Sequence, residues 1–183
     1  AQQWLAHQGM ERPRIEGGFK ALRQQSLEIL GRPDKTFWLL SGRTGSAKTV
    51  IIKQLHNSID LEGHANHRGS AFGRRLTPQP SPVTFECALT ADYLRHSQQN
   101  LVVEDESRTI GSVGLPERWH QSMQHADIAL LEVDIEQRIS HIEEEYVDQA
   151  LHEAEQHGFT QEDLHQRYHS ALLRIGKRLG GVR

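Results

Sequence analysis

Hydrophobic and polar positions along the first part of the chain alternate between short apolar runs and amphipathic stretches. Apolar residues recur on one helical face over residues 19–30, and Gly31 and Pro33 follow as helix-ending residues. Residues 36–40 form a continuous apolar run, which is typical of a strand that is buried on both faces. A second amphipathic helix is predicted over residues 48–57, after a glycine-containing loop.

The same pattern predicts three further strands. They cover residues 58–62, 101–103 and 128–133. A helix that carries Phe85 and a short helix that begins near Pro116 are expected before the last two strands. The stretch 63–82 is rich in Gly, His, Arg and Pro, and we expect it to be a long irregular loop of the functional kind. Strands that alternate with helices predict an α/β fold, with a parallel sheet flanked by helices.

The C-terminal part of the chain has a purely helical pattern. Apolar residues recur three and four positions apart over residues 135–154 and again over residues 164–179. Gly158 can end the first helix, and Thr160 with Asp163 resembles a capping pair before the second. We expect a helical hairpin whose apolar stripes pack on each other or on the sheet.

These patterns divide the chain into three parts. They are a tail or linker at residues 1–18, an α/β domain at 19–134, and a truncated helical portion at 135–183. No apolar run approaches the ~18 residues of a membrane helix. The N-terminus also lacks the layout of a signal peptide. The sequence therefore predicts a cytoplasmic protein with no membrane association.

Charge and metal-binding residues exclude some classes of function. The 183 residues carry 21 Lys and Arg against 24 Asp and Glu, so the net charge of −3 gives no sign of the basic domain typical of nucleic-acid-binding proteins. Cys87 is the single cysteine, which excludes an intrachain disulfide and a cysteine-rich zinc site. His64 and His67 have H-x-x-H spacing but lack an intervening Glu and a third ligand, so we do not expect zinc there.

The clearest chemical motif is the stretch 41–49, SGRTGSAKT. It matches the phosphate-loop (P-loop) pattern G-x-x-x-x-G-K-[ST] at Gly42, Lys48 and Thr49, with Ala47 in place of the second glycine. In such a loop, backbone N–H groups and the lysine bind phosphate oxygens, and the threonine ligates Mg²⁺. The predicted phosphate-binding residues are Gly42, Arg43, Thr44, Gly45, Ser46, Ala47, Lys48 and Thr49.

Ala47 is the departure from this pattern. Its methyl group lies where the backbone and a phosphate approach closely, so we expect weaker anion binding than with glycine. A change of Ala47 to Gly is predicted to tighten diphosphate binding. If the position is helical, the change also leaves the melting temperature equal or slightly lower.

Acidic and basic residues elsewhere suggest partners for the loop. The strand at 101–103 ends in carboxylates, and we expect Asp105 rather than Glu104 to hold Mg²⁺ with Thr49. Arg138 follows the last strand where a charge-stabilising arginine can lie, although a position on a helix surface is equally compatible. The glutamates at 143–145 are expected on a solvated helix face.

Arg68, Arg74 and Arg75 form a cationic cluster in the 63–82 stretch. They are predicted to contact phosphate, either of a ligand or of an RNA backbone, and a solvated surface loop is the equal alternative.

Four stretches together resemble the tRNA 2-selenouridine synthase family. They are IEGGFKALR at 15–23, the phosphate loop, DLEGHANHRGSAFG at 60–73 and VEDESRTIG at 103–111. The last two are long and unusual in composition, and the resemblance covers most of the chain.

The resemblance implies a P-loop domain that follows an N-terminal rhodanese-like domain, of which residues 1–18 are the tail. It implies a transferase that replaces the sulfur of wobble 2-thiouridine in tRNA with selenium from selenophosphate, through a geranylated intermediate made from geranyl diphosphate. The family's catalytic cysteine lies in a loop that this sequence does not contain, and Cys87 does not match it.

The same resemblance suggests roles for particular residues. The P-loop would hold the diphosphate of geranyl diphosphate, or a nucleotide, while Lys48, Asp105 and Arg108 act as catalytic residues with Mg²⁺ on Thr49 and Asp105. Candidate contacts to substrate or tRNA are Asn66, His67, Arg68, Arg74, Arg75 and Ser107.

Two other functions fit the P-loop alone. A small-molecule or nucleoside kinase needs the same strand, loop, helix and acidic strand end. A non-catalytic module would bind nucleotide to order the 63–82 stretch and dock a partner.

Overall fold

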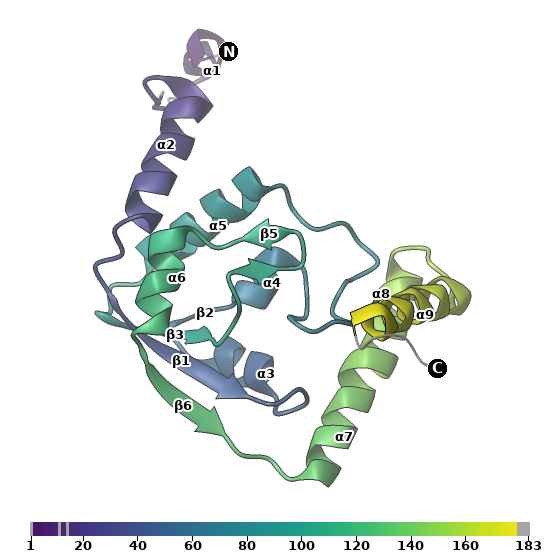
Figure 1. Ribbon diagram of the computed structural model, residues 1–183. Coiled ribbons are helices and arrows are strands. Elements are labelled where there is room, and N and C mark those ends of the chain that lie inside the picture. The colour runs from purple at the N-terminus through teal and green to yellow at the C-terminus, as the bar shows by residue number, and fades with distance from the viewer. Residues whose placement is uncertain (1, 11, 14, 179–183) are drawn as a thin grey trace.

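The computed structural model describes residues 2–10, 12, 13 and 15–178. Its centre is a parallel sheet with the strand order β2-β3-β1-β6 (Figure 1). The strands are β1 (Thr36–Gly42), β2 (Ser58–Ile59), β3 (Asn100–Glu104) and β6 (Asp127–Leu131). A short antiparallel ribbon, β4 (Thr109–Ile110) with β5 (Val113–Gly114), follows β3.

Helices cover both faces of the sheet. In chain order, the helices before β6 are α1 (Gln2–His7), α2 (Gly18–Leu30), α3 (Lys48–Gln54), α4 (Leu61–Ala65), α5 (Pro82–Arg95) and α6 (Glu117–Gln124). Helix α3 packs against β1, β2 and β3 on one face. On the other face Trp119 of α6 is fully buried, and its ring lies 4.6 Å from that of Phe37 and 5.2 Å from that of Tyr93. Burial of each large apolar side chain contributes about 1.5–3 kcal/mol, so this face is the main core.

The C-terminal helices stand beside the sheet (Figure 1). They are α7 (Ile135–Glu143), a π-helical turn η1 (Glu144–Asp148), α8 (Gln149–Gln156) and α9 (Gln161–Arg178). Helices α8 and α9 form the expected hairpin. The backbone N–H of Thr160 donates to Asp163 Oδ2 at 2.7 Å, and that of Asp163 donates to Thr160 Oγ1 at 3.2 Å, as the capping pair predicts.

The predicted α/β fold is confirmed, with corrections to individual elements. The strand expected at 58–62 stops at Ile59, because Asp60 accepts a hydrogen bond from the N–H of Gly63 at 2.6 Å and caps α4 instead. The ribbon of β4 and β5 was not predicted, since its strands are only two residues long. The helix expected at 48–57 ends at Gln54.

The two stripes of the hairpin pack only in part. The small side chains of Ala150 and Ala171 are buried, but Ile135 is 61% exposed, and Ile139 and Leu172 are each 57% exposed. The prediction that the whole stripes pack was therefore wrong for these three residues. Leu179 lies outside the described residues.

The stretch 63–82 is not irregular throughout. It begins inside α4, and a bridge between His67 and Arg74 closes a narrow turn. From there the chain runs across to α8 and α9 (Figure 1). No helix in the described part of the chain combines the length and apolar character needed to cross a membrane.

Candidate phosphate-binding site

The P-loop turns back at the carboxyl end of β1, the edge where parallel α/β sheets bind ligands. Gly45 and Ala47 adopt left-handed backbone conformations, with φ of 82° and 60°. A Cβ on Gly42 would lie 2.5 Å from Ser46 Oγ and 3.2 Å from Leu131, so a side chain there would displace the serine hydroxyl and crowd β6. Lys48 Nζ donates to the carbonyl oxygen of Gly42 at 2.8 Å, which holds the lysine across the loop.

Helix α7 supports the loop from outside. Arg138 Nε donates to the carbonyl oxygen of Thr44 at 3.0 Å. His141 Nδ1 lies 2.8 Å from the carbonyl oxygen of Gly45, and since a carbonyl can only accept, that nitrogen carries a hydrogen. Arg138 is thus placed on the backbone of the loop and does not line the cavity in front of it.

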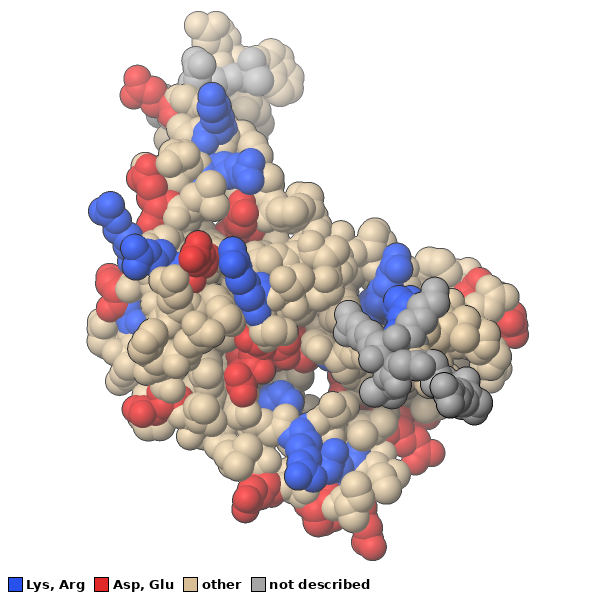
Figure 2. Space-filling model, in the orientation of Figure 1, with Lys and Arg blue, Asp and Glu red and all other residues tan. Residues whose placement is uncertain are grey.

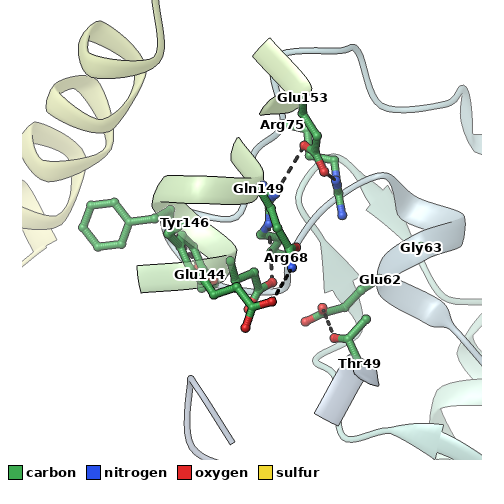
Figure 3. A network of polar contacts seen from close by, with 12 residues as sticks. Thr49, Glu62, Gly63, Arg68, Arg75, Glu144, Tyr146, Gln149 and Glu153 are labelled. Carbon is green, nitrogen blue, oxygen red and sulfur yellow. Dashed lines mark hydrogen bonds and ion pairs between the residues drawn. The ribbon is translucent and has the colours of Figure 1, made fainter. Parts of the chain in front are cut away.

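A cavity of about 440 Å³ lies between the P-loop, the start of α4 and η1. Figure 2 shows basic and acidic side chains gathered around a hollow near the middle of this face. Its charged lining residues from outside the P-loop are Lys53, Glu62, Arg68, Arg75, Glu106, Glu144 and Glu145. Figure 3 shows Thr49 and Glu62 on one side of the site and Arg68 on the other.

Carboxyl groups gather where β2 and β3 end. Thr49 Oγ1 donates to Glu62 Oε2 at 3.1 Å. Burial, together with the neighbouring Glu106, raises the pKa of Glu62 to about 8, and burial also raises the pKa of Glu106. Glu104 is fully buried and accepts a hydrogen bond from the N–H of Glu62 at 3.1 Å. Burial and the charges of Asp60 and Glu62 raise the pKa of Glu104 to about 9.

Arg68 lies on the opposite wall, with only 2% of its side chain exposed. Its Nε lies 3.4 Å from Glu145 Oε1, and its Nη2 donates to Glu153 Oε2 at 3.2 Å (Figure 3). Its guanidinium carbon lies 5.7 Å from the ring centre of Tyr146. Arg75 also pairs with Glu153, and although burial opposes them, the two arginines lower the pKa of that carboxyl.

Three buried polar atoms of residues in this lining have no hydrogen-bond partner: Ser46 Oγ, Arg68 Nε and Arg68 Nη1. Arg68 Nε faces Glu145 in an ion pair, so Ser46 Oγ and Arg68 Nη1 are the two left with neither a hydrogen bond nor an ion pair among the described residues. An unpaired buried donor costs about 1–3 kcal/mol, so the cavity is suited to a ligand that brings acceptor oxygens.

The structure brings most of the predicted phosphate-binding residues together. The members that line the cavity are Gly42, Thr44, Gly45, Ser46, Ala47, Lys48 and Thr49, and Arg43 is exposed beside it. Asp105 and Arg108 are not brought there. Both are exposed, and Asp105 Oδ2 accepts a hydrogen bond from Ser41 Oγ at 2.7 Å. Their catalytic and metal-binding roles stay predictions.

The predicted substrate contacts divide into two groups. Arg68 and Arg75 line the cavity at the P-loop, paired with carboxylates. His67, Arg74 and Ser107 line a second cavity, described below. Asn66 instead braces its own turn, since its Nδ2 donates to Thr77 Oγ1 at 2.9 Å.

Sequence reasoning missed Glu62, Glu106 and Tyr146. The sequence-based prediction put Glu62 inside a strand, whereas in the structure it lies just after the end of β2. A carboxylate directly after the carboxyl end of a parallel strand lies at the edge where ligands bind, and this position is the signal that could have identified Glu62. The expectation of a solvated face at 143–145 was wrong for Glu145, because its carboxylate faces Arg68 and burial raises its pKa.

Comparison with known proteins finds one matching family model. The sequence model of a family described as "tRNA 2-selenouridine synthase AAA domain" matches residues 35–183. No solved structure matches the chain.

Curated relatives are similar over the whole chain. A tRNA 2-selenouridine synthase of Hydrogenovibrio crunogenus is 45% identical over 193 residues, which cover 100% of this chain and 52% of that protein. The corresponding proteins of Shewanella frigidimarina and Pseudomonas fluorescens are 42% and 44% identical, over 99% and 100% of this chain and 52% of each relative. The chain thus spans about half the length of these relatives. It belongs to the tRNA 2-selenouridine synthase family.

Proposed function

We propose that this chain is the diphosphate-binding part of a transferase that replaces the sulfur of wobble 2-thiouridine in tRNA with selenium. In this proposal a geranylated intermediate is formed first, and the P-loop holds the diphosphate of the geranyl donor. The printed names of the relatives support the tRNA reaction. Selenophosphate and a rhodanese-like domain serve the later exchange, which we place outside this chain.

One observation carries the diphosphate assignment. Ser46 Oγ and Arg68 Nη1 are buried without partners on the walls that also hold Lys48. Oxygens of a diphosphate between these walls would accept from all three groups. Charge-assisted hydrogen bonds of this kind are roughly twice as strong as neutral ones.

The chemistry asked of these residues is stabilisation of a leaving group. The thiouridine sulfur attacks C1 of the geranyl chain, the C1–O bond breaks, and its electron pair leaves with the diphosphate. Lys48, Arg68 and Ser46 would donate to the oxygens where that charge gathers. Fixed donors in a partly dry site need little reorganisation during the reaction.

Mg²⁺ fits this site through residues other than the predicted Asp105. Among the described residues, no group of three or more His, Cys, Asp or Glu side chains could hold a metal ion. Mg²⁺, however, often takes only one or two carboxylates and completes its shell with phosphate oxygens and water. Thr49, Glu62 and Glu106 line the cavity and would hold it, and the ion would supply charge neutralisation.

The proposal is tested by titrating geranyl diphosphate, ATP and GTP, each with Mg²⁺, while the melting temperature is recorded. Geranyl diphosphate at about 100 times its Kd should stabilise the chain by about 2.7 kcal/mol. Lys48→Ala should abolish the shift. The matched control Lys20→Ala, on the exposed surface of α2, should retain it.

Other results would favour other functions. Hydrolysis of ATP, or its use on a small hydroxyl substrate without RNA, would favour a kinase. Tight nucleotide binding without turnover would favour a binding module. A chain that is stabilised by none of the three ligands would contradict the proposal.

A further inference from the structure

A second, larger cavity of about 1070 Å³ lies next to the P-loop cavity. One wall is the chain from His67 to Gln79, another is the region of β4 and β5, and a third is α9. The two cavities share Gly69, Ser70 and Arg75 in their linings. A molecule in the second cavity therefore lies directly beside a ligand on the P-loop.

The arginines of this region differ in what they already bind. Arg68 and Arg75 are paired with glutamates of η1 and α8. Arg74 and Arg174 also line the second cavity, but both are exposed, and neither side chain forms a hydrogen bond or ion pair within the described part of the chain. They come from different walls, so an anion between them can be contacted from two sides.

A buried histidine stands in the same lining. His67 is 9% exposed, and its Nδ1 is buried without a hydrogen-bond partner. A Cβ on Gly111 would lie 2.7 Å from His67 Cδ2, so the glycine leaves room for the ring. Burial and the nearby arginines lower the pKa of His67, which keeps the imidazole neutral and able both to donate and to accept.

The remaining lining is mixed in character. Leu76 and Ile175 supply apolar surface, and Ser107 and Thr77 supply hydroxyl groups. A nucleotide has matching parts: an apolar base face, a polar base edge and a flanking phosphate. Single-stranded RNA is recognised in this way, through splayed bases and cationic contacts to the backbone.

We propose that the second cavity binds one single-stranded nucleotide of the RNA substrate, with its phosphates between Arg74 and Arg174 and its base beside His67. This inference rests on the proposed function, because the acceptor nucleotide must reach the carbon next to the diphosphate. The shared wall at Gly69, Ser70 and Arg75 puts the two ligands within that reach.

The test measures binding of an anticodon stem-loop RNA that carries 2-thiouridine at the wobble position. Fluorescence anisotropy is recorded over a range of salt concentrations for the parent chain, Arg74→Ala, Arg174→Ala and the double variant. The double variant should lose at least about tenfold in affinity, and its salt slope should fall by about 1.4, since each single-strand phosphate contact contributes about 0.7. Geranyl diphosphate should still raise its melting temperature as in the parent.

Arg95→Ala is the matched control, because Arg95 is exposed at the end of α5 and does not line either cavity. It should bind RNA like the parent. Equal RNA affinity and salt slope in the parent and the double variant would overturn the inference and leave the proposed function standing. Loss of geranyl diphosphate binding with RNA binding intact would also overturn it, since the cavity would then serve the donor. A parent that binds neither ligand would contradict the proposed function itself.

Discussion

At the scale of single residues, Ala47 carries a conformational cost that most alanines do not. It precedes the first residue of α3 with φ of 60° and ψ of 28°, in the left-handed region that disfavours side chains with a Cβ. The sequence-based expectation about stability assumed a helical position, and this premise was wrong. The direction of the predicted change in melting temperature therefore reverses.

Ala47→Gly should raise the melting temperature of the ligand-free protein. Relief of the left-handed strain is worth about 1–2 kcal/mol, and the added freedom of the unfolded chain takes back about 0.4–1 kcal/mol. The net gain of up to about 1.6 kcal/mol corresponds to a rise of up to about 6 °C for a chain of this length. Ala91→Gly, at an exposed position inside α5, is the control and should lower the melting temperature. Calorimetry that shows a fall for both variants would contradict this account.

Replacement of Arg68 should strongly lower the free energy of unfolding. Arg68→Met leaves Glu145 and Glu153 without their buried cation, and loss of one partner of such a pair costs about 3 kcal/mol or more. Urea unfolding measures the loss. Arg75→Met is the matched comparison, because its side chain is 23% exposed and contacts Glu153 alone, so it should cost less. Equal losses for the two variants would show that Arg68 does not hold the network together.

At the scale of elements, the ends of β2 and β3 concentrate carboxyl groups in a buried place. Glu104 is the last residue of β3, and Glu62 lies in the first turn of α4. The backbone N–H of Glu62 donates a hydrogen bond to the carboxyl group of Glu104. Both carboxyls have raised pKa values, of about 9 and about 8. A group whose pKa is higher in the folded state binds more protons there than in the unfolded chain. Its stabilising effect is complete below its ordinary pKa and is lost as pH rises toward the folded value.

The melting temperature without added Mg²⁺ should therefore fall as pH rises from about 5 to about 9. Glu104→Gln removes one titrating group and keeps an acceptor for the N–H of Glu62, so its melting temperature should fall less over this range. One pKa unit corresponds to about 1.4 kcal/mol, or about 3–6 °C here. Glu132→Gln, at an exposed position, is the control and should follow the parent. Parallel curves for Glu104→Gln and the parent would count against burial of this carboxyl in the folded state.

The elements that the sequence predicted well are those with a strong local signal. The apolar run of β1, the P-loop and the capped helix α9 each carry their own pattern, and seven residues of the P-loop line one cavity. The opposite wall of the cavity could not be predicted from the sequence, because Arg68 and Glu145 are 77 positions apart and meet only through tertiary packing. Asp105 was preferred to Glu104 on residue type alone, and Glu106, which lines the cavity, was not considered, because only the path of the chain after β3 shows which carboxylate faces the cavity.

At the scale of the whole molecule, the sheet is covered unevenly. β6 is the outermost strand and pairs with β1 alone among the described strands. Ile128 and Leu130 are two positions apart on β6, so they lie on the same face of the strand. Although both are apolar, they are 60% and 63% exposed. A free backbone edge beside exposed apolar side chains favours pairing with another chain.

Leu130→Lys should reduce self-association at high protein concentration. The side chain is already exposed, so the free energy of unfolding should change by less than about 0.5 kcal/mol. Sedimentation velocity over a concentration series measures the association. Leu172→Lys, on α9, is the control: its side chain is 57% exposed but lies on a helix without a free strand edge. If both variants reduce association equally, or neither does, the edge of β6 is not responsible.

The wall that the two cavities share also has a thermodynamic consequence. Because Gly69, Ser70 and Arg75 contact both spaces, a ligand that orders this segment in one cavity changes the work of binding in the other. Such coupling is reciprocal. If the first ligand changes the affinity for the second by some factor, the second ligand changes the affinity for the first by the same factor. With positive coupling, a diphosphate in the P-loop cavity would be bound most tightly while the second cavity is occupied, so each ligand would dissociate more slowly in the presence of the other.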